Sequence, residues 1–277
     1  MKRLIILLLF TSSVLVGFSQ TTSGYAAVFK KKIIENRKPI PYQGVREADV
    51  IWAKLLWREI NLGEKVNLPL YFPKEPLDGR YSLVDLLLKG IKEQTIIAFD
   101  TDDDEFQVPI GYDAIQKKFG AGTKMVELEQ PDGSIINKEV VTDAITSEVK
   151  KVLVKELWYF DKQSSTMQVR IIGLCPVRIY KKENNPDELQ MKLFWINYND
   201  CRKNLVQQEV YNNRNDALRL SFDDVFIRRR FSSIVMKESN VYNNRSIGSY
   251  AKGVDAMIES DRIKNEMFNW EQDLWHY

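Results

Sequence analysis

The sequence predicts an α+β fold: a largely antiparallel β-sheet in the middle of the chain, flanking helices and a long C-terminal helix. Three segments rich in β-branched and aromatic residues are separated by turn-like segments: 149–160, 167–180 and 189–198. In the second of them, apolar residues alternate with Gln168, Arg170 and Arg178, which indicates a sheet with one buried face. Residues 253–274 instead carry apolar side chains at helical spacing.

The N-terminus indicates export. Lys2 and Arg3 precede an apolar run, and Gly17 and Ser19 place small residues before a cleavage site, so we expect a secretory signal peptide over residues 1–19. The apolar run is well short of the ~20 residues that span a bilayer. No cysteine follows the cleavage site, so the sequence gives no lipid-anchoring site there.

Charge and residue counts exclude several function classes. Removing the signal peptide takes away two of the 40 basic residues, which balances the 38 acidic ones, and a neutral chain gives no reason to expect a nucleic-acid partner. The only histidine is His276, next to last in the chain, so neither a catalytic triad nor a two-histidine zinc site is expected. The sequence therefore predicts no catalytic, cofactor-binding or metal-binding residues.

Two parts are expected after the signal peptide. Residues 20–44 are predicted to form an extended basic arm, because Pro39 and Pro41 favour extended backbone. The arm contains the run Lys30, Lys31 and Lys32, which is either a solvated basic patch or a docking site for an acidic partner. Residues 45–277 are predicted to form a single α+β domain.

The first element of that domain is predicted to be a helix over 45–60. Its polar stripe is narrow, with Glu47, Lys54 and Arg58 on one side. A helix this apolar is covered on more than one side, either by its own domain or partly by another subunit.

Further elements have local signals of their own. Ser82 with Asp85 and Ser221 with Asp224 resemble capping boxes that open helices. The second of these helices ends near the arginines of 228–230, which complement the helix dipole or bind an anionic partner. A short strand is expected at 96–99, and the turn residues at 131–134 predict a hairpin between the segments 124–129 and 135–141.

The acidic cluster 100–105 is interpreted as a solvated loop. It starts like a calcium-binding loop, but Glu105 stands where that loop needs glycine, and Gly111 stands where it needs glutamate. Acidic residues are nevertheless numerous, so a carboxylate-dependent hydrolase is not excluded by counts alone.

Cys175 and Cys201 are predicted to be unpaired. If 167–180 and 189–198 form a hairpin centred near Asn184, Cys175 lies opposite Phe194. Cys201 is then about 20 Å farther along at roughly 3.3 Å per residue, beyond the ~7 Å reach of a disulfide.

The C-terminal helix is predicted to have two apolar stripes. The first has a heptad-like spacing and contains Ala256, Ser260, Ile263, Met267, Trp270 and Leu274. The second, roughly opposite, contains Val254, Met257, Ile258, Phe268 and Trp275. Such a helix lies either between two parts of its own domain or against another subunit. As a hypothetical partner interface we take Ile263, Met267, Trp270 and Leu274, together with Lys30, Lys31 and Lys32.

Several stretches, in order along nearly all of the mature chain, resemble the GldN, or PorN, family of gliding-motility proteins. They are Arg46 to Trp52, Asn67 to Pro73, Val169 to Gly173, Cys175-Pro176, Phe194-Trp195, Phe231 to Ser233, Lys237 to Tyr242 and Asp273 to Trp275. The resemblance implies a non-catalytic component of the type IX secretion system, which also supports gliding.

The resemblance also implies a location and partners. The family's proteins are expected in the periplasm, held peripherally at the outer membrane by the lipoprotein GldK/PorK in large self-associated rings. The inner-membrane-anchored GldM/PorM is the other implied contact. Two alternatives remain: a carboxylate-dependent periplasmic glycan hydrolase, and a soluble periplasmic adaptor or chaperone.

Overall fold

The computed structural model describes residues 34, 36–77, 79–102, 104–129, 135–142, 144–182, 185–212 and 218–274. These residues belong to one compact unit that begins at Ile34. The expected signal peptide, 1–19, and the run Lys30, Lys31 and Lys32 lie outside the described residues.

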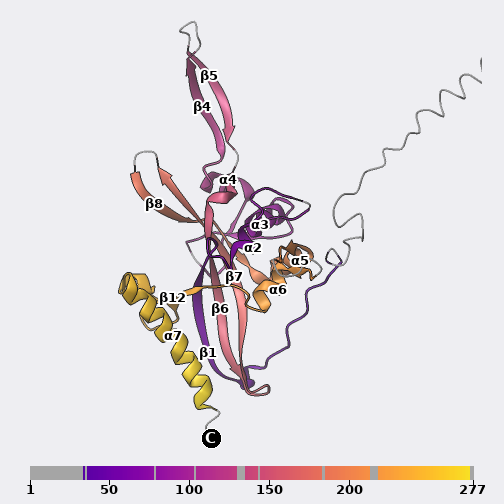
Figure 1. Cartoon of the computed structure of the whole chain (residues 1–277), viewed down its shortest axis with the longest axis vertical. Coiled ribbons are helices and arrows are strands. Elements are labelled where there is room, and N and C mark those ends of the chain that lie inside the picture. The colour runs from indigo at the N-terminus through magenta and orange to yellow at the C-terminus, as the bar shows by residue number, and fades with distance from the viewer. Residues whose placement is uncertain are drawn as a thin grey trace, which may run out of the picture. The chain divides into compact units, whose positions relative to one another are not determined.

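An antiparallel sheet of eight strands forms the centre of this unit, in the order β12-β1-β6-β7-β9-β2-β3, with β8 also paired to β7. Its strands are β1 (Val50–Asn61), β2 (Ala98–Phe99), β3 (Pro109–Ile110), β6 (Val149–Asp161), β7 (Thr166–Lys182), β8 (Asn185–Lys192), β9 (Trp195–Asn197) and β12 (Ile234–Glu238). Two strand pairs lie outside it: β4 (Gly122–Glu129) with β5 (Ile135–Thr142), and β10 (Glu209–Val210) with β11 (Leu220–Ser221). The predicted fold class and the predicted strands are confirmed (Figure 1).

The helices of the described chain are α2 (Leu68–Tyr71), α3 (Leu83–Lys92), α4 (Tyr112–Lys118), α5 (Tyr198–Gln207), α6 (Phe222–Ile227) and α7 (Val254–Asp273), with short 3-10 turns at Glu47–Asp49, Thr146–Glu148 and Ile247–Ser249. Ser82 caps α3 by accepting a hydrogen bond from the Asp85 backbone N–H. Ser221 and Asp224 form a complete capping box at α6. Both predicted helix starts are therefore confirmed.

The helix predicted over 45–60 is wrong, because most of this segment is strand β1. Side chains alternate across a strand, so Trp52, Leu56 and Ile60 lie on one face and Leu55 and Trp57 on the other. Both faces are covered. A strand covered on both faces is apolar almost throughout, and that pattern looks like a helix buried all round.

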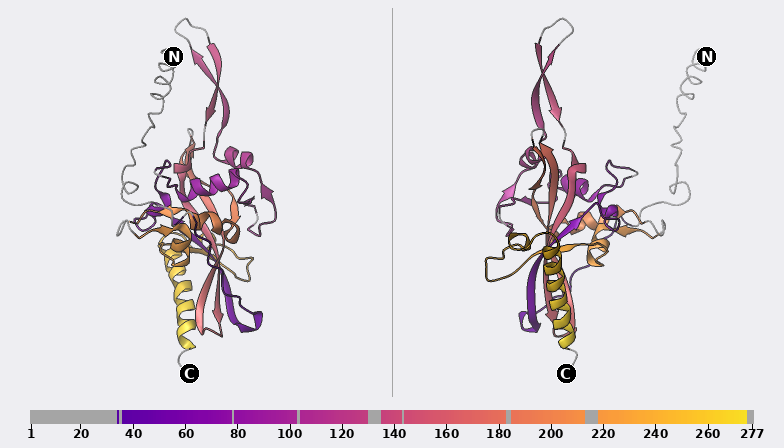
Figure 2. Two further views of the ribbon diagram at one scale, coloured as in Figure 1. Left: turned by 90° about the vertical axis from the view of Figure 1, so that its right-hand side faces the viewer. Right: turned by 60° about the vertical axis from the view of Figure 1, so that its left-hand side comes forward.

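Helices and a loop cover the two faces of the sheet. On the face of Leu56, α7 packs over one end of the sheet (Figure 2). There Ile263 and Met267 lie in one core cluster with Leu56 and Val235. The shorter helices α2 to α6 cover the other end of this face, around Ile60, in the largest hydrophobic core. The second face carries Trp57, Cys175 and Trp195, against which Phe106 packs.

The sequence indicated that the acidic cluster forms a solvated loop. In the structure, carboxylates of this loop instead contact other parts of the fold. Asp104 accepts a hydrogen bond from the Trp57 indole and pairs with Lys155, whose Nζ also donates to the Asp104 carbonyl at 2.8 Å. Asp100 pairs with Lys118 at 2.7 Å. Because Lys155 is buried in the sheet, these contacts hold the loop over the second face.

Arg229 also has a role beyond the helix dipole. It follows α6 and reaches the carboxylate of Glu156 with both terminal nitrogens, at 2.9 and 3.2 Å. Glu156 is fully buried on β6, and an unpaired charge there would be costly. Arg229 is therefore an internal counter-ion.

The predicted cysteine state is confirmed, because Cys175 and Cys201 are both free and buried. β7 and β8 pair with Val177 opposite Lys192, and the Leu193 N–H then donates to the Pro176 carbonyl. Beyond it β9 pairs with β7 with Leu174 opposite Ile196, which places Cys175 opposite Trp195, one residue from the expected position. Cys201 lies away from the hairpin, in α5.

The described end of the expected arm, 36–44, is extended and is packed on the rest of the fold. Arg37 pairs with Asp224 at 2.8 Å. Tyr42 lies between the guanidinium groups of Arg170 and Arg202, which are 4.3 and 4.2 Å from its ring centroid. Two ring-cation contacts and an ion pair therefore fix this segment.

Candidate interaction surfaces

The predicted seam of α7 faces the chain's own sheet. Ile263 and Met267 are buried in the core, and Trp270 stacks on Trp52 with ring centroids 5.1 Å apart. Trp270 also meets Phe160 edge to face at 5.6 Å. These three residues therefore pack within the chain and are not a free partner surface, whereas Leu274 is 39% exposed.

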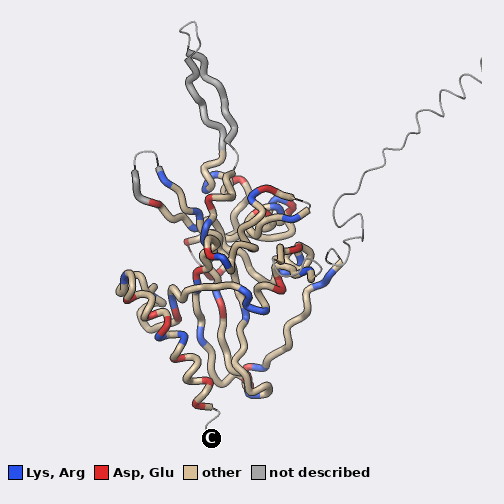
Figure 3. The backbone as a smooth tube through the Cα atoms, viewed as in Figure 1, with Lys and Arg blue, Asp and Glu red and all other residues tan. Residues whose placement is uncertain are grey.

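The second stripe of α7 is left open. Val254, Met257, Ile258 and Phe268 are 70%, 56%, 62% and 57% exposed. The helix that carries them also has acidic and basic residues mixed along its length (Figure 3). Single exposed apolar side chains are common, but several large ones on one helix indicate a contact surface.

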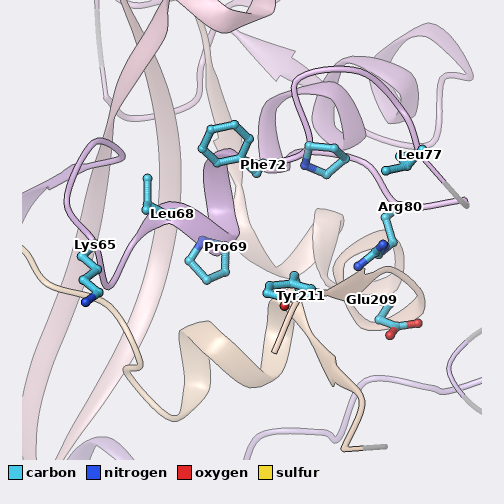
Figure 4. Close-up of a pocket in the computed structure, with 9 residues that line it drawn as sticks. Lys65, Leu68, Pro69, Phe72, Leu77, Arg80, Glu209 and Tyr211 are labelled. Atoms are coloured by element: carbon cyan, nitrogen blue, oxygen red, sulfur yellow. The ribbon is translucent and has the colours of Figure 1, made fainter. Parts of the chain in front are cut away.

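A groove that the sequence did not predict lies between α2 and β10. It consists of two adjoining hollows of about 430 and 720 Å³ that share Lys65, Pro69 and Tyr211. Figure 4 shows the smaller hollow, which Tyr211 lines together with Leu68, Pro69, Phe72 and Leu77. Its volume lies within the range of binding sites for small molecules and side chains.

The groove is assembled from segments far apart in the chain. The segment Asn67 to Pro73 forms the first wall, and it contains the short helix α2, which begins at Leu68. The opposite wall is Tyr211, directly after β10. The pairing of β10 with β11, two strands far from α2 in the chain, places Tyr211 there, so a pattern along the sequence could not show the groove.

The buried carboxylates are all engaged in structural contacts. Asp223 accepts hydrogen bonds from Arg202 and from the Tyr198 hydroxyl, the latter at 2.8 Å. Glu156 accepts from Arg229 and from the Trp158 indole, and Asp161 from the turn that follows it. Each of these three carboxylates is thus hydrogen-bonded within the fold.

A glycosidase also needs a carboxyl group whose pKa is raised. Hydrogen bonding lowers the pKa of Asp100, through Lys118, and of Glu259, through Arg262. Burial alone would raise the pKa of Asp224, but hydrogen bonds from Ser221 and Arg37 outweigh it and the pKa is lowered. The pKa values of Asp100, Asp224 and Glu259 therefore all move away from that of a general acid.

The family described as gliding motility associated protein GldN matches residues 45–276. The chain belongs to the GldN family. No curated protein matches it. The description names gliding motility and no reaction, so the GldN-family chain is a gliding-motility-associated protein.

The family match confirms the resemblance drawn from the sequence. One of the stretches behind that resemblance, Asn67 to Pro73, forms a wall of the groove in this GldN-family chain. Of the residues described, no helix has the length and apolar character needed to cross a bilayer. In the same residues, no group of three or more His, Cys, Asp or Glu side chains could hold a metal ion.

Proposed function

We propose that this GldN-family protein is a non-catalytic structural subunit of the type IX secretion and gliding machinery. It acts in the periplasm, at the outer membrane, through the lipoprotein GldK/PorK, contacts GldM/PorM, and associates with itself in a ring. Family membership supports the motility role. The expected signal peptide supports export.

One observation favours a subunit of an assembly over a free adaptor: α7 buries one stripe and leaves the other exposed. We assign the exposed stripe to a second copy of the chain. The helix carries the acidic residues Glu259 and Asp261 and the basic residues Arg262 and Lys264. A surface with charges of both signs suits contact with an identical helix.

The test is co-purification from detergent-solubilised outer membranes, with the size of the recovered complex measured. The wild-type protein should be recovered with the lipoprotein in a complex much larger than one copy. Recovery of the protein free of membranes would contradict the proposal and favour a soluble adaptor.

Variants test the stripe itself. Ile258→Asp should reduce self-association about thirtyfold, because a buried apolar contact at an interface is worth about 2 kcal/mol. Its melting temperature should stay within about 2 °C of wild type, since Ile258 is mostly exposed. Glu266→Gln, exposed on a flank of the same helix away from the stripe, is the matched control, and an equal effect of both variants would reject the stripe as an interface.

The enzyme alternative has its own test. In a deletion strain, Glu and Asp residues would be changed singly to amides. Loss of secretion by one such variant, with the complex still assembled, would contradict a non-catalytic role.

A further inference from the structure

We propose that the groove between α2 and β10 binds a short peptide segment of a partner protein, one that combines apolar side chains with a carboxylate. This inference rests on the proposed role as an assembly component. It concerns a different surface from the exposed stripe of α7.

The walls of the groove fit apolar side chains. Phe72, Leu77 and Tyr211 are all exposed at its mouth. The second hollow adds Val66 and Leu218, which are exposed as well. Two adjoining hollows with apolar walls suit successive side chains of a peptide, and filling them removes several exposed apolar groups from water.

The charges at the rim favour an acidic occupant. Lys65 and Arg80 line the first hollow, and Arg230 lines the second. In the part of the chain that the structure describes, none of these three side chains forms an ion pair. The acidic residue of the lining, Glu209, is already paired with Arg219 at 3.1 Å. The groove therefore offers three cations that no carboxylate of the described residues pairs with, since its one lining carboxylate is paired with Arg219.

Arg80 provides the most specific feature. Its guanidinium lies 5.7 Å from the centroid of the Tyr211 ring, and Figure 4 shows the two side chains beside each other at the hollow. Among the described residues, the Arg80 Nε is buried without a hydrogen-bond partner. A buried donor of this kind needs an acceptor, and a carboxylate can bind a guanidinium through two parallel hydrogen bonds.

The same charges argue against the chain's own arm as the occupant. The segment 24–33 has apolar residues but carries Lys30, Lys31 and Lys32 and no acidic residue. Placing three more cations near Lys65, Arg80 and Arg230 is repulsive. An acidic segment from a different polypeptide fits the rim better.

Fluorescence anisotropy with the purified mature protein tests the proposal. The probe is a labelled octapeptide of alternating leucine and aspartate, compared with its leucine and asparagine counterpart. The acidic peptide should bind at least about tenfold more tightly, and raising the salt concentration should weaken its binding. Equal affinity of the two peptides would overturn the proposal.

Variants locate the binding. Arg80→Gln should lower affinity for the acidic peptide about tenfold and leave the amide peptide unchanged, whereas Tyr211→Ser should weaken both. Lys203→Gln, an exposed cation of α5 outside the groove, is the matched control and should change neither. If Arg80→Gln behaves like Lys203→Gln, the groove is not the site.

Two further probes decide between occupants. Tighter binding of a peptide with the sequence of residues 24–33 would assign the groove to the chain's own arm and overturn the proposal. Binding of phosphatidylglycerol vesicles but not of the acidic peptide would assign the groove to lipid and would also overturn the proposal. The assay uses the protein alone, so failure of the outer-membrane co-purification would reject the proposed function without changing this result.

Discussion

Gly173 lies where the sheet leaves no room for a side chain. A Cβ there would come within 2.5 Å of the Phe106 ring and 3.0 Å of the Ile196 carbonyl oxygen. The close approach lets Phe106 pack over the second face beside Trp195, with ring centroids 6.2 Å apart. The absence of a side chain at one residue thus allows the acidic loop to be held on the sheet.

Gly173→Ala should therefore destabilise the protein by about 1–3 kcal/mol, because overpacking displaces the Phe106 ring or strands β7 and β9. Gly44→Ala is the control, since Gly44 lies outside the helices and strands and a Cβ at that position meets nothing within 4 Å. Urea unfolding measures both. Adding Phe106→Leu to Gly173→Ala should recover part of the loss, and an unchanged unfolding midpoint in Gly173→Ala would contradict the packing argument.

The two thiols should be inert in the folded protein. Burial raises the pKa of Cys175 to about 12 and also raises the pKa of Cys201. Since the thiolate is the reactive form, iodoacetamide at pH 8 should leave the native protein unmodified and add two groups after unfolding in urea. Mass spectrometry counts the added groups in the native and in the unfolded protein. Modification of the native protein as fast as of the unfolded protein would contradict the burial of the two thiols.

At the N-terminus of α6, the carboxylate of Asp224 takes part both in the capping box and in the ion pair with Arg37 of the arm. Asp224 accepts from the Ser221 backbone N–H at 3.0 Å and from Arg37 at 2.8 Å. The lowered pKa of Asp224 means that its stabilising effect is fully present above the ordinary pKa of about 3.9. That effect is lost as the pH falls through the lower, folded-state pKa.

Asp224→Asn should consequently cost about 1–2 kcal/mol at pH 7, and its difference from wild type should shrink as the pH falls below about 4. Urea unfolding at pH 7, 5 and 3 gives this difference directly. Asp102→Asn, in the acidic loop, is the control. A difference that stays constant down to pH 3 would show that the charge of Asp224 does not contribute.

The helix α7 is fixed to the sheet by its aromatic end. Trp270→Ala removes the stacking on Trp52 and the contact with Phe160, and should cost about 2 kcal/mol, or roughly 4–8 °C in melting temperature. Phe268→Ala, on the exposed stripe, is the matched control and should change it little. Equal melting temperatures for the two variants would contradict the inward orientation of the Trp270 stripe.

At the scale of the whole molecule, the described strands form separate pairing groups. β4 and β5 pair only with each other in the described chain, with Gly122 opposite Thr142 at the base of the hairpin. The eight-stranded sheet, by contrast, joins segments from β1 to β12. The hairpin is therefore an appendage rather than part of the central sheet.

Replacing residues 122–142 by a short Gly-Ser linker should leave the rest folded, because the two ends of the hairpin already lie opposite each other. The urea midpoint should stay close to that of the intact protein. Replacing β12 instead should unfold it, since β12 carries Val235 of the core under α7. A cooperative loss of structure on removing the hairpin would contradict its independence.

The sequence by itself determined the features that local patterns encode. Helix caps at Ser82 and Ser221, the β7–β8 register beside Cys175, and the two stripes of α7 are each set by neighbouring residues. Hydrogen bonding within a turn and side-chain periodicity need no distant partner. Short stretches such as Arg46 to Trp52 likewise indicated the family, and the family match over residues 45–276 confirms it.

Only the tertiary structure decided what covers each apolar surface. β1 is a strand because both of its faces meet distant segments, and a pattern that is apolar on all sides does not distinguish it from a buried helix. One stripe of α7 faces the sheet because Trp270 stacks on the Trp52 ring. The groove exists because Tyr211 and Pro69, which are far apart in the chain, line it together. Periodicity tells which side chains avoid water, but the surface that each meets depends on contacts between residues far apart in the chain.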